Sequence, residues 1–401
     1  MNRIFLDVHA LQTVPPSNLN RDDTGAPKTA VYGGVPRARV SSQAWKRAVR
    51  TYFKDEHLLD PAELGVRTKK VVELLADRIA EFAPAIERET ALRLADETVK
   101  ATGCKTEVPK RKADQAKKDG SATPAPESKY LLFLSSRQLD GLARFALEGA
   151  DDITAFLKTK ENKARAKELA DTRHSVDIAL FGRMVADVAD INVDAAVQVA
   201  HALSVHRVDN ESDYYTAVDD ENTDEETGAG MIGTVDFNSA TLYRYAALGV
   251  HQLAANLGQG LREDEPRTEP VRRAVEAFVH AFAASLPTGK INTFGHHTEP
   301  DAVIVRLRTT RPISYVAAFE EPVRSDGGGH LREAADRLAA YADDVERAYG
   351  DPDTTLTWIL RVGPATQKLA ELAELGTESA SLRELVTAVG QAVAEHLEKP
   401  A

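Results

Sequence analysis

The chain has 401 residues, 43% of them hydrophobic, which is enough for two or three packing units with a buried core. No run reaches the roughly 18 apolar residues that a membrane helix needs, and Asp7 and His9 interrupt an N-terminus that would be purely apolar in a signal peptide, so we expect a cytoplasmic protein without a membrane partner. The single cysteine, Cys104, excludes an internal disulfide and a thiolate-rich zinc site. A net charge of -12 argues, as an average, against a nucleic-acid-binding protein.

The average hides a strong segregation of charge along the chain. Residues 28–54 contain seven basic side chains and no acidic one, namely Lys28, Arg37, Arg39, Lys46, Arg47, Arg50 and Lys54. Residues 209–226 contain nine acidic side chains and no basic one, namely Asp209, Glu211, Asp213, Asp219, Asp220, Glu221, Asp224, Glu225 and Glu226. Because charges act mainly within a Debye length of about 10 Å, an acidic protein can still present one cationic face.

The predicted elements begin with a strand at residues 3–11, where apolar side chains fall on both faces. A long structured loop, rich in Pro, Gly, Asn and Asp, follows at 12–36. The next segment predicts a helix that begins at a capping serine, with Trp45 and Phe53 on its apolar stripe. Its opposite side is basic and has no acid to pair with before Asp55, so we interpret it as a phosphate-binding face rather than a solvated one.

Residues 63–199 follow a helical pattern and predict an inserted α-helical domain. Four segments carry apolar residues at i, i+3 and i+4, namely 71–82, 91–102, 131–149 and 194–206. Between them, residues 105–129 are rich in Lys, Pro and Ala and have almost nothing apolar to bury, so we expect a mobile, solvated loop. Contact between its lysines and nucleic acid is the alternative.

Residues 208–230 hold too few apolar residues for a core and too many acids for a stable helix, and they predict an extended excursion. After it come a predicted strand at 233–250, an amphipathic helix at 270–287 and a second strand at 301–310. Together with the N-terminal strand and helix, this order predicts an α+β fold, a βαβ-βαβ or ferredoxin-like sheet with the helical region inserted between its halves.

No motif in the sequence indicates catalysis. Residues 288–290 read TGK but lack the other residues of a phosphate-binding loop, and the histidine pairs, His296 with His297 and His201 with His206, have no further ligand at a metal-binding spacing. Cys104 lies beside a basic loop that we expect to be exposed, with nothing to mark a nucleophile. We therefore expect no catalytic residue, no metal and no cofactor.

One enzymatic alternative stays open. The clustered carboxylates of the acidic excursion could hold Mg²⁺ and cleave RNA by metal-assisted hydrolysis, with Asp209, Asp213, Asp219 and Asp220 as the candidate ligands. An acidic loop is more often only solvated.

Several segments together carry a resemblance to a known family. Residues 19–50 read LNRDDTGAPKTAVYGGVPRARVSSQAWKRAVR, and HSVDIALFGRM, DYYTAVDD and GTVDF followed by YRYA come later in the chain. In order, spacing and extent these segments resemble the CasC family, the backbone subunit of the type I-E CRISPR surveillance complex, Cascade.

That resemblance implies the shape of a right hand. Residues 1–57 and 239–401 would form an RRM-like (ferredoxin-like) palm, the second part together with C-terminal helices. Residues 58–198 would form α-helical fingers, and residues 206–238 an extended thumb loop.

The resemblance also implies which residues bind. The predicted RNA-binding residues of the palm are Lys28, Arg39, Ser41, Gln43, Lys46, Arg47, Arg50 and, by a weaker match, Lys290. Met184 and Thr216 match the positions that flank a displaced base, and Tyr214 and Tyr215 match a pair of thumb aromatics that would pack on nucleotides or on the adjoining subunit. A core-filling role is the alternative for Met184 considered alone.

The function implied is a non-catalytic RNA-binding subunit in antiviral defence. It would assemble head to tail along the guide crRNA, kink out bases at regular intervals and present the rest for pairing with target DNA. The implied partners are the crRNA, the target DNA, about six copies of itself and the subunits CasA, CasB, CasD and CasE. A plain RRM-like single-strand binder outside CRISPR is a further alternative.

The acidic thumb departs from what we expect of this family, because carboxylates lying against RNA would be repelled. We therefore expect these carboxylates to point toward solvent or toward the basic segment of the next subunit, which would favour head-to-tail assembly.

Overall fold

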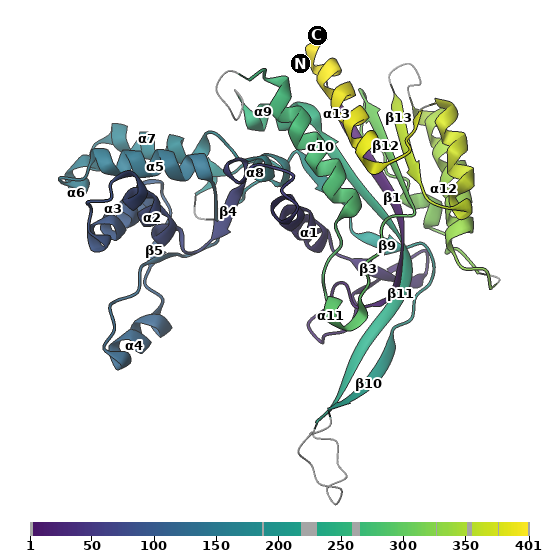
Figure 1. Ribbon diagram of the computed structural model, residues 1–401, viewed down its shortest axis with the longest axis horizontal. Helices are drawn as coiled ribbons and strands as arrows, with labels where there is room; N and C mark the ends of the chain where they lie inside the picture. Colours follow the sequence, from purple (N-terminus) through teal and green to yellow (C-terminus); the bar gives the residue numbers. More distant parts are fainter. Residues whose placement is uncertain are drawn as a thin grey trace, which may run out of the picture. The chain divides into compact units, whose positions relative to one another are not determined.

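The computed structural model describes residues 3–186, 188–217, 231–258, 265–325, 327–350, 355–375 and 377–399 (Figure 1). Its contacts divide the chain into two compact units. The first, here called the sheet unit, comprises Met1–Glu56, Val197–His251 and Val275–Ala401. The second, the helical unit, comprises His57–Ala196 and Gln252–Ala274.

A ten-stranded sheet organises the sheet unit, with the order β14-β13-β12-β1-β11-β9-β3-β2 and with β8 and β10 paired to β11 off this path. Its neighbours are antiparallel except β13 and β14, which pair parallel. The strands are β1 (Phe5–Ser17), β2 (Thr29–Tyr32), β3 (Val35–Val40), β8 (Val197–Val199), β9 (Ala202–Ser204), β10 (Glu211–Ala217), β11 (Met231–Gly249), β12 (Ala302–Arg308), β13 (Leu356–Arg361) and β14 (Thr377–Glu378).

Helices and short 3-10 turns surround this sheet. They are α1 (Ser42–Asp55), α9 (Val250–Leu257), α10 (Thr268–Ala284), α11 (Ile291–Phe294), η3 (Val316–Phe319), α12 (Leu331–Tyr349), η4 (Pro364–Leu375) and α13 (Leu382–Glu398), with α9 and α10 each divided between the two units. The mixed α+β class predicted from the sequence is confirmed.

Two hydrophobic cores lie on opposite faces of the sheet. Strand β11 alternates between them, since Leu242 packs with Trp45 of α1 whereas Tyr243 packs with Leu338 of α12. Helices α1 and α12 accordingly lie on opposite sides of the sheet in Figure 1. The predicted strands at 3–11, 233–250 and 301–310 are confirmed as β1, β11 and β12.

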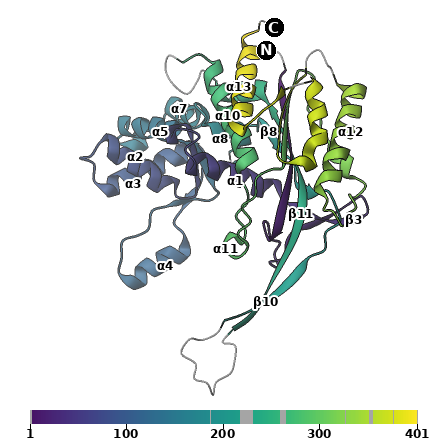
Figure 2. The same cartoon turned by 45° about the vertical axis from the view of Figure 1, so that its right-hand side comes forward.

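A two-stranded ribbon projects beyond the sheet, as both Figure 1 and Figure 2 show. Strand β11 is continuous over 19 residues, and it pairs with β1 through most of its length and with β10 at its N-terminal end. The excursion predicted at 208–230 is therefore a paired strand, β10, as far as Ala217, and residues 218–230 lie outside the described part of the chain.

The helical unit packs around a core of its own that includes Leu75, Leu94 and Leu142. Its elements are η1 (Pro61–Glu63), β4 (Gly65–Thr68), α2 (Val71–Phe82), α3 (Arg88–Ala101), β5 (Thr106–Glu107), α4 (Lys110–Asp119), β6 (Glu127–Ser128), β7 (Leu132–Ser135), α5 (Ser136–Glu148), α6 (Ile153–Phe156), α7 (Lys160–Asp171), α8 (Val176–Phe181) and η2 (Ala189–Ile191). No helix in the described ranges is long and apolar enough to cross a bilayer.

Three expectations about secondary structure were wrong. Residues 194–206, predicted as a helix, form β8 and β9, because pairing with β11 and β3 overrides a pattern that fits both periods. The loop predicted at 105–129 contains the helix α4, which ends at Gly120 in the left-handed conformation and buries Ala116. The loop predicted at 12–36 contains the end of β1, the whole of β2 and the start of β3. Cys104, which precedes the 105–129 segment, is buried in the core of the helical unit.

Candidate nucleic-acid interface

Asn20 ties the loop before β2 to the start of α1. Its Oδ1 accepts a hydrogen bond from the Ser41 backbone N–H at 2.9 Å, and its carbonyl accepts from the Lys28 N–H at 2.9 Å. The Lys28 carbonyl in turn accepts from the Arg39 N–H at 2.9 Å. One amide side chain therefore brings Lys28, Arg39 and the N-terminus of α1 into a single surface, all within the sheet unit.

Helix α1 presents a basic side above a buried one. Ser41 caps it by accepting from the Ala44 N–H, and Trp45 and Phe53 are buried on its inner side. The first turn contains no acidic residue, so the partial positive charge of the helix N-terminus is not neutralised. On the outer side, Gln43, Arg47 and Lys54 are exposed, and Lys46 and Arg50 are half-buried.

Burial lowers the pKa of Lys46, because its ammonium group has lost part of its hydration. The helix thus holds a partly desolvated cation beside exposed ones. Partly desolvated charges interact more strongly with an incoming phosphate than fully solvated charges do. The structure therefore places the predicted residues of α1 together on one outward surface.

A buried guanidinium holds α1 against the sheet. Arg244 on β11 lies with its Cζ 3.8 Å from the Trp45 ring centroid and donates to Gln12 Oε1 at 2.6 Å and to the Phe282 carbonyl. Burial lowers the pKa of Arg244 to about 9, so the group remains charged at neutral pH. This contact fixes the rotation of α1 about its own axis, and the basic stripe faces outward as a result.

Arg37, which the sequence analysis counted among the basic side chains of residues 28–54, does not contribute to the outward charge of this segment. Its side chain is fully buried, and it donates to the carbonyls of Tyr32, Ser204, Phe319 and Glu320. The guanidinium therefore links the β2–β3 hairpin to η3 and is not part of the surface. The outward cations of this segment are the remaining six.

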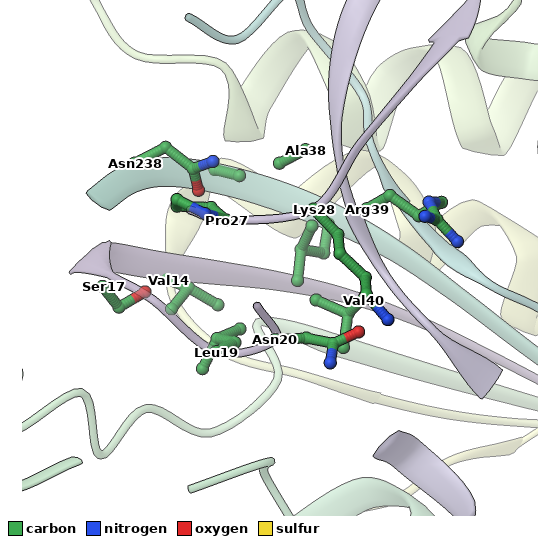
Figure 3. A pocket seen from close by; sticks show the side chains of 12 residues that line it. Val14, Ser17, Leu19, Asn20, Pro27, Lys28, Ala38, Arg39, Val40 and Asn238 are labelled. Atoms are coloured by element: carbon green, nitrogen blue, oxygen red, sulfur yellow. The ribbon is translucent and has the colours of Figure 1, made fainter. Parts of the chain in front are cut away.

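Arg39 is oriented by two hydrogen bonds. Its Nε donates to the Thr29 carbonyl at 3.0 Å, and its Nη1 lies 3.2 Å from His201 Nδ1. Beside it, Figure 3 shows Lys28, Arg39 and Asn20 around a small pit floored by Val14 and other apolar side chains. The pit has a volume of about 20 Å³, which fits one water molecule and is too small for a base.

Lys290 belongs to the same unit and is exposed. It precedes α11 with φ of 54°, in the left-handed region. The preceding Gly289 packs so closely on the chain at Asn18 and Leu19 that an added Cβ would lie 2.4 Å from the Leu19 carbonyl oxygen. Only glycine fits this contact, which holds Lys290 beside the loop that leads to Asn20 and Lys28.

The two predicted aromatics differ in their surroundings. Tyr215 lies over Gly233 of the facing strand, where an added Cβ would meet its ring at 2.3 Å. Tyr214, with 76% of its surface exposed, projects on the other face of the ribbon together with Thr216. Ribbon packing therefore uses Tyr215 and leaves Tyr214 available for contact.

Hydrogen bonds hold the base of the β10–β11 ribbon beside the basic surface. Asn18 Nδ2 donates to the carbonyls of Gly25 and Asp236, and Asn238 Nδ2 donates to Asn210 Oδ1 at 2.9 Å. These contacts join the base of β10–β11 to the loop that carries Asn20 and Lys28.

Met184 belongs to the helical unit. It lies in a turn closed by the Arg183 to Val193 bridge, and 83% of its surface is exposed. The alternative that Met184 fills a core is therefore wrong. A thioether held out into solvent is suited to apolar contact with a base, and that role of Met184 stays a prediction.

The carboxylates of the nuclease alternative are only partly described. Asp209 forms an ion pair with Arg207 at 3.2 Å and Asp213 lies on β10, whereas Asp219 and Asp220 fall outside the described residues. Across the described ranges, no three His, Cys, Asp or Glu side chains are grouped so that they could hold a metal ion.

Comparison with known proteins identifies the family. Residues 6–388 match the family described as CT1975-like protein. The chain belongs to this family. The match, together with the structures below, confirms the CasC-family resemblance found in the sequence.

Two solved structures resemble the chain over nearly its whole length. A chain of "CRISPR RNA-guided surveillance complex, pre-nicking" is 34% identical with a TM-score of 0.81, and the match covers 97% of this chain and 100% of that one. A chain of "CRISPR RNA-guided surveillance complex" is 30% identical with a TM-score of 0.71, covering 97% and 99%. No curated protein sequence matches the chain.

Sequence reasoning missed His201 on this surface and the buried Arg244 beneath it. His201 was considered only as one of a histidine pair, and Arg244 was not considered at all. Neither role could be predicted from spacing in the sequence, because strand pairing brings Arg39 close to His201 and the packing of α1 on the sheet brings Trp45 close to Arg244.

Proposed function

We propose that the protein is a non-catalytic RNA-binding backbone subunit of a type I-E CRISPR surveillance complex and that it acts in the cytoplasm. The observation that carries this proposal is the outward surface of Lys28, Arg39, α1 and Lys290, which is cationic although the protein as a whole has a net charge of -12. Because the chain resembles chains of CRISPR RNA-guided surveillance complexes, we take the bound RNA to be a guide RNA.

In this proposal the sheet unit is the palm. The central strand order β12-β1-β11, with α1 after the β1–β3 strands and α9 and α10 after β11, supports the RRM-like interpretation of residues 1–57 and 239–401. The helical unit corresponds to the fingers and the β10–β11 ribbon to the thumb.

The palm residues bind the sugar-phosphate backbone of the guide and make no base-specific contact. Exposed cations and the N-terminus of α1 contact phosphates, with Ser41 and Gln43 as uncharged donors. Such contacts carry no sequence information, so base pairing between guide and target DNA supplies the specificity.

The ribbon and Met184 act on the bases. Tyr214 and Thr216 form the exposed face of the ribbon, and we assign them, with Met184, to the displacement of one base at regular intervals. A base lifted from the stack leaves the intervening bases ordered for pairing with target DNA.

The subunit assembles with about six copies of itself and with CasA, CasB, CasD and CasE. Opposite charges of residues 28–54 and 209–226 support head-to-tail contact between copies. Catalysis is not part of the proposal, since basic side chains can bind and position RNA without any reacting group on this surface.

Co-purification tests the proposal. A tagged chain expressed in its own host should bring down guide RNA and the other subunits, and elution of bound RNA should show many spacer sequences in similar yield. A tagged chain that purifies without RNA, or with one preferred spacer sequence, would overturn it.

A further inference from the structure

The imidazole of His201, between β8 and β9, lies on the cationic surface beside Arg39. His201 is exposed, and its Nδ1 lies 3.2 Å from Arg39 Nη1. Because a guanidinium can only donate, Nδ1 accepts this hydrogen bond and the neutral ring carries its proton on Nε2. No described residue supplies a partner for Nε2.

This arrangement gives the histidine two tasks at once. Its Nδ1 and the Thr29 carbonyl together occupy two of the five N–H groups of Arg39 and hold the guanidinium plane in place. Its own Nε2–H remains a donor on the same surface. Arg39 on β3 and His201 in the β8–β9 connection therefore present neighbouring N–H groups, an arrangement suited to binding two oxygens of one phosphodiester.

We propose that His201 is an RNA-binding residue that takes up a proton when a phosphodiester of the RNA binds beside Arg39, so that the affinity for RNA rises as the pH falls. This inference rests on the proposed function, since it needs RNA at this surface. It assigns to that surface a residue and a proton linkage that the family likeness does not carry.

Electrostatics of the free protein agree with this direction. The pKa of His201 is lowered by burial first, and then by the positive charges of Arg39 on β3 and Lys28 ahead of β2. These are the charged groups whose fields act on the ring, and no carboxylate of the described residues is among them. The free protein therefore keeps His201 neutral near pH 7.

Binding of a phosphate reverses the sign of the local field. A phosphodiester anion neutralises Arg39 and Lys28 and favours the imidazolium, so the pKa of His201 rises in the complex. Protonated Nδ1 no longer accepts from Arg39, and the Nη1–H is released to the phosphate as well. Each unit of difference between the bound and free pKa strengthens binding by about tenfold at low pH.

Fluorescence anisotropy with a labelled oligouridine tests the proposal between about pH 5.5 and 8, the range in which histidine titrates. Wild-type protein should bind about tenfold more tightly at the acidic end than H201Q does, and the two should agree at the alkaline end within about threefold. H396Q, which replaces a half-buried histidine on α13 outside this surface, should follow the wild-type profile.

Calorimetry in two buffers of different ionisation enthalpy counts the protons taken up on binding. Wild-type protein should take up a fraction of a proton near pH 6 that H201Q does not. If H201Q and wild type show the same pH profile and the same proton uptake, the inference is overturned. If wild-type protein binds oligouridine at no pH, the proposed function itself fails instead.

Discussion

Neutralising two cations of α1 tests the basic surface most directly. The variant K46Q/R47Q removes one half-buried and one exposed charge and keeps two side chains of similar length. Trp45 and the Ser41 cap are untouched, so the helix should remain in place.

The expected size of the effect follows from counterion release. If the six outward cations of residues 28–54 and Lys290 all contact phosphates, the logarithm of the RNA affinity falls with the logarithm of salt concentration with a slope of about -5. Loss of two contacts makes the slope less steep by about 1.4 units. At about 0.1 M salt each contact contributes about 0.9 kcal/mol, so the variant should bind about twentyfold more weakly.

The assay is anisotropy of labelled oligouridine over a salt series. The matched control is R383Q/K399Q, which changes the net charge equally at two exposed positions, one on α13 and one directly after it. The control should change affinity less than about twofold, because its charges lie outside the surface. Equal slopes for K46Q/R47Q and wild type, or equal losses in both variants, would refute the assignment of α1 as the phosphate-binding face.

Three further outcomes are expected. W45A should lower the free energy of unfolding in urea by about 3–5 kcal/mol, because it empties a fully buried site beneath α1. The free energy of unfolding should fall by up to about 3 kcal/mol as the pH drops from about 6.5 to 4. Burial lowers the pKa of His206 to about 4, so the unfolded chain binds a proton at this histidine at a higher pH than the folded chain does. Urea unfolding over a pH series measures the fall. Y214A should weaken RNA binding by about 1–3 kcal/mol in the anisotropy assay without changing the melting temperature, whereas Y215A should also loosen the ribbon over Gly233.

Each of these outcomes has a contrary result. A loss under about 1 kcal/mol in W45A would mean that α1 is not held through this ring. H206Q should flatten the pH dependence, since glutamine does not titrate, and an unchanged profile would show that other groups cause it. Equal behaviour of Y214A and Y215A in both assays would contradict the division of roles between the two faces of the ribbon.

Local patterns were enough to predict α1 and its outward charge. A capping serine followed by apolar residues at helical spacing fixes both the start of the helix and its buried side, and the charges fall on the remainder. The α+β class and the family likewise follow from patterns that are complete within short segments.

Long-range contacts decided what the sequence did not reveal. A count of charges along the sequence treats Arg37 as a surface cation, whereas its burial depends on carbonyls far away in the chain, those of Ser204 and Phe319 among them. The apolar pattern of residues 194–206 is compatible with a helix, and these residues form strands because they pair with β11 and β3. The hydrogen bond from Arg39 to His201 depends on that same pairing.

The continuity of β11 from the sheet into the ribbon sets a rule for changing the ribbon's length. Because successive side chains alternate between two faces, removing one residue from each of β10 and β11 would turn Tyr214 to the opposite side, whereas removing two from each would keep its side and shorten the ribbon by about 7 Å. Ribbons that keep Tyr214 on its present side should therefore differ in length only by multiples of two residue pairs. If the ribbon sets the spacing between displaced bases of a bound RNA, that spacing can be changed only in steps of this size.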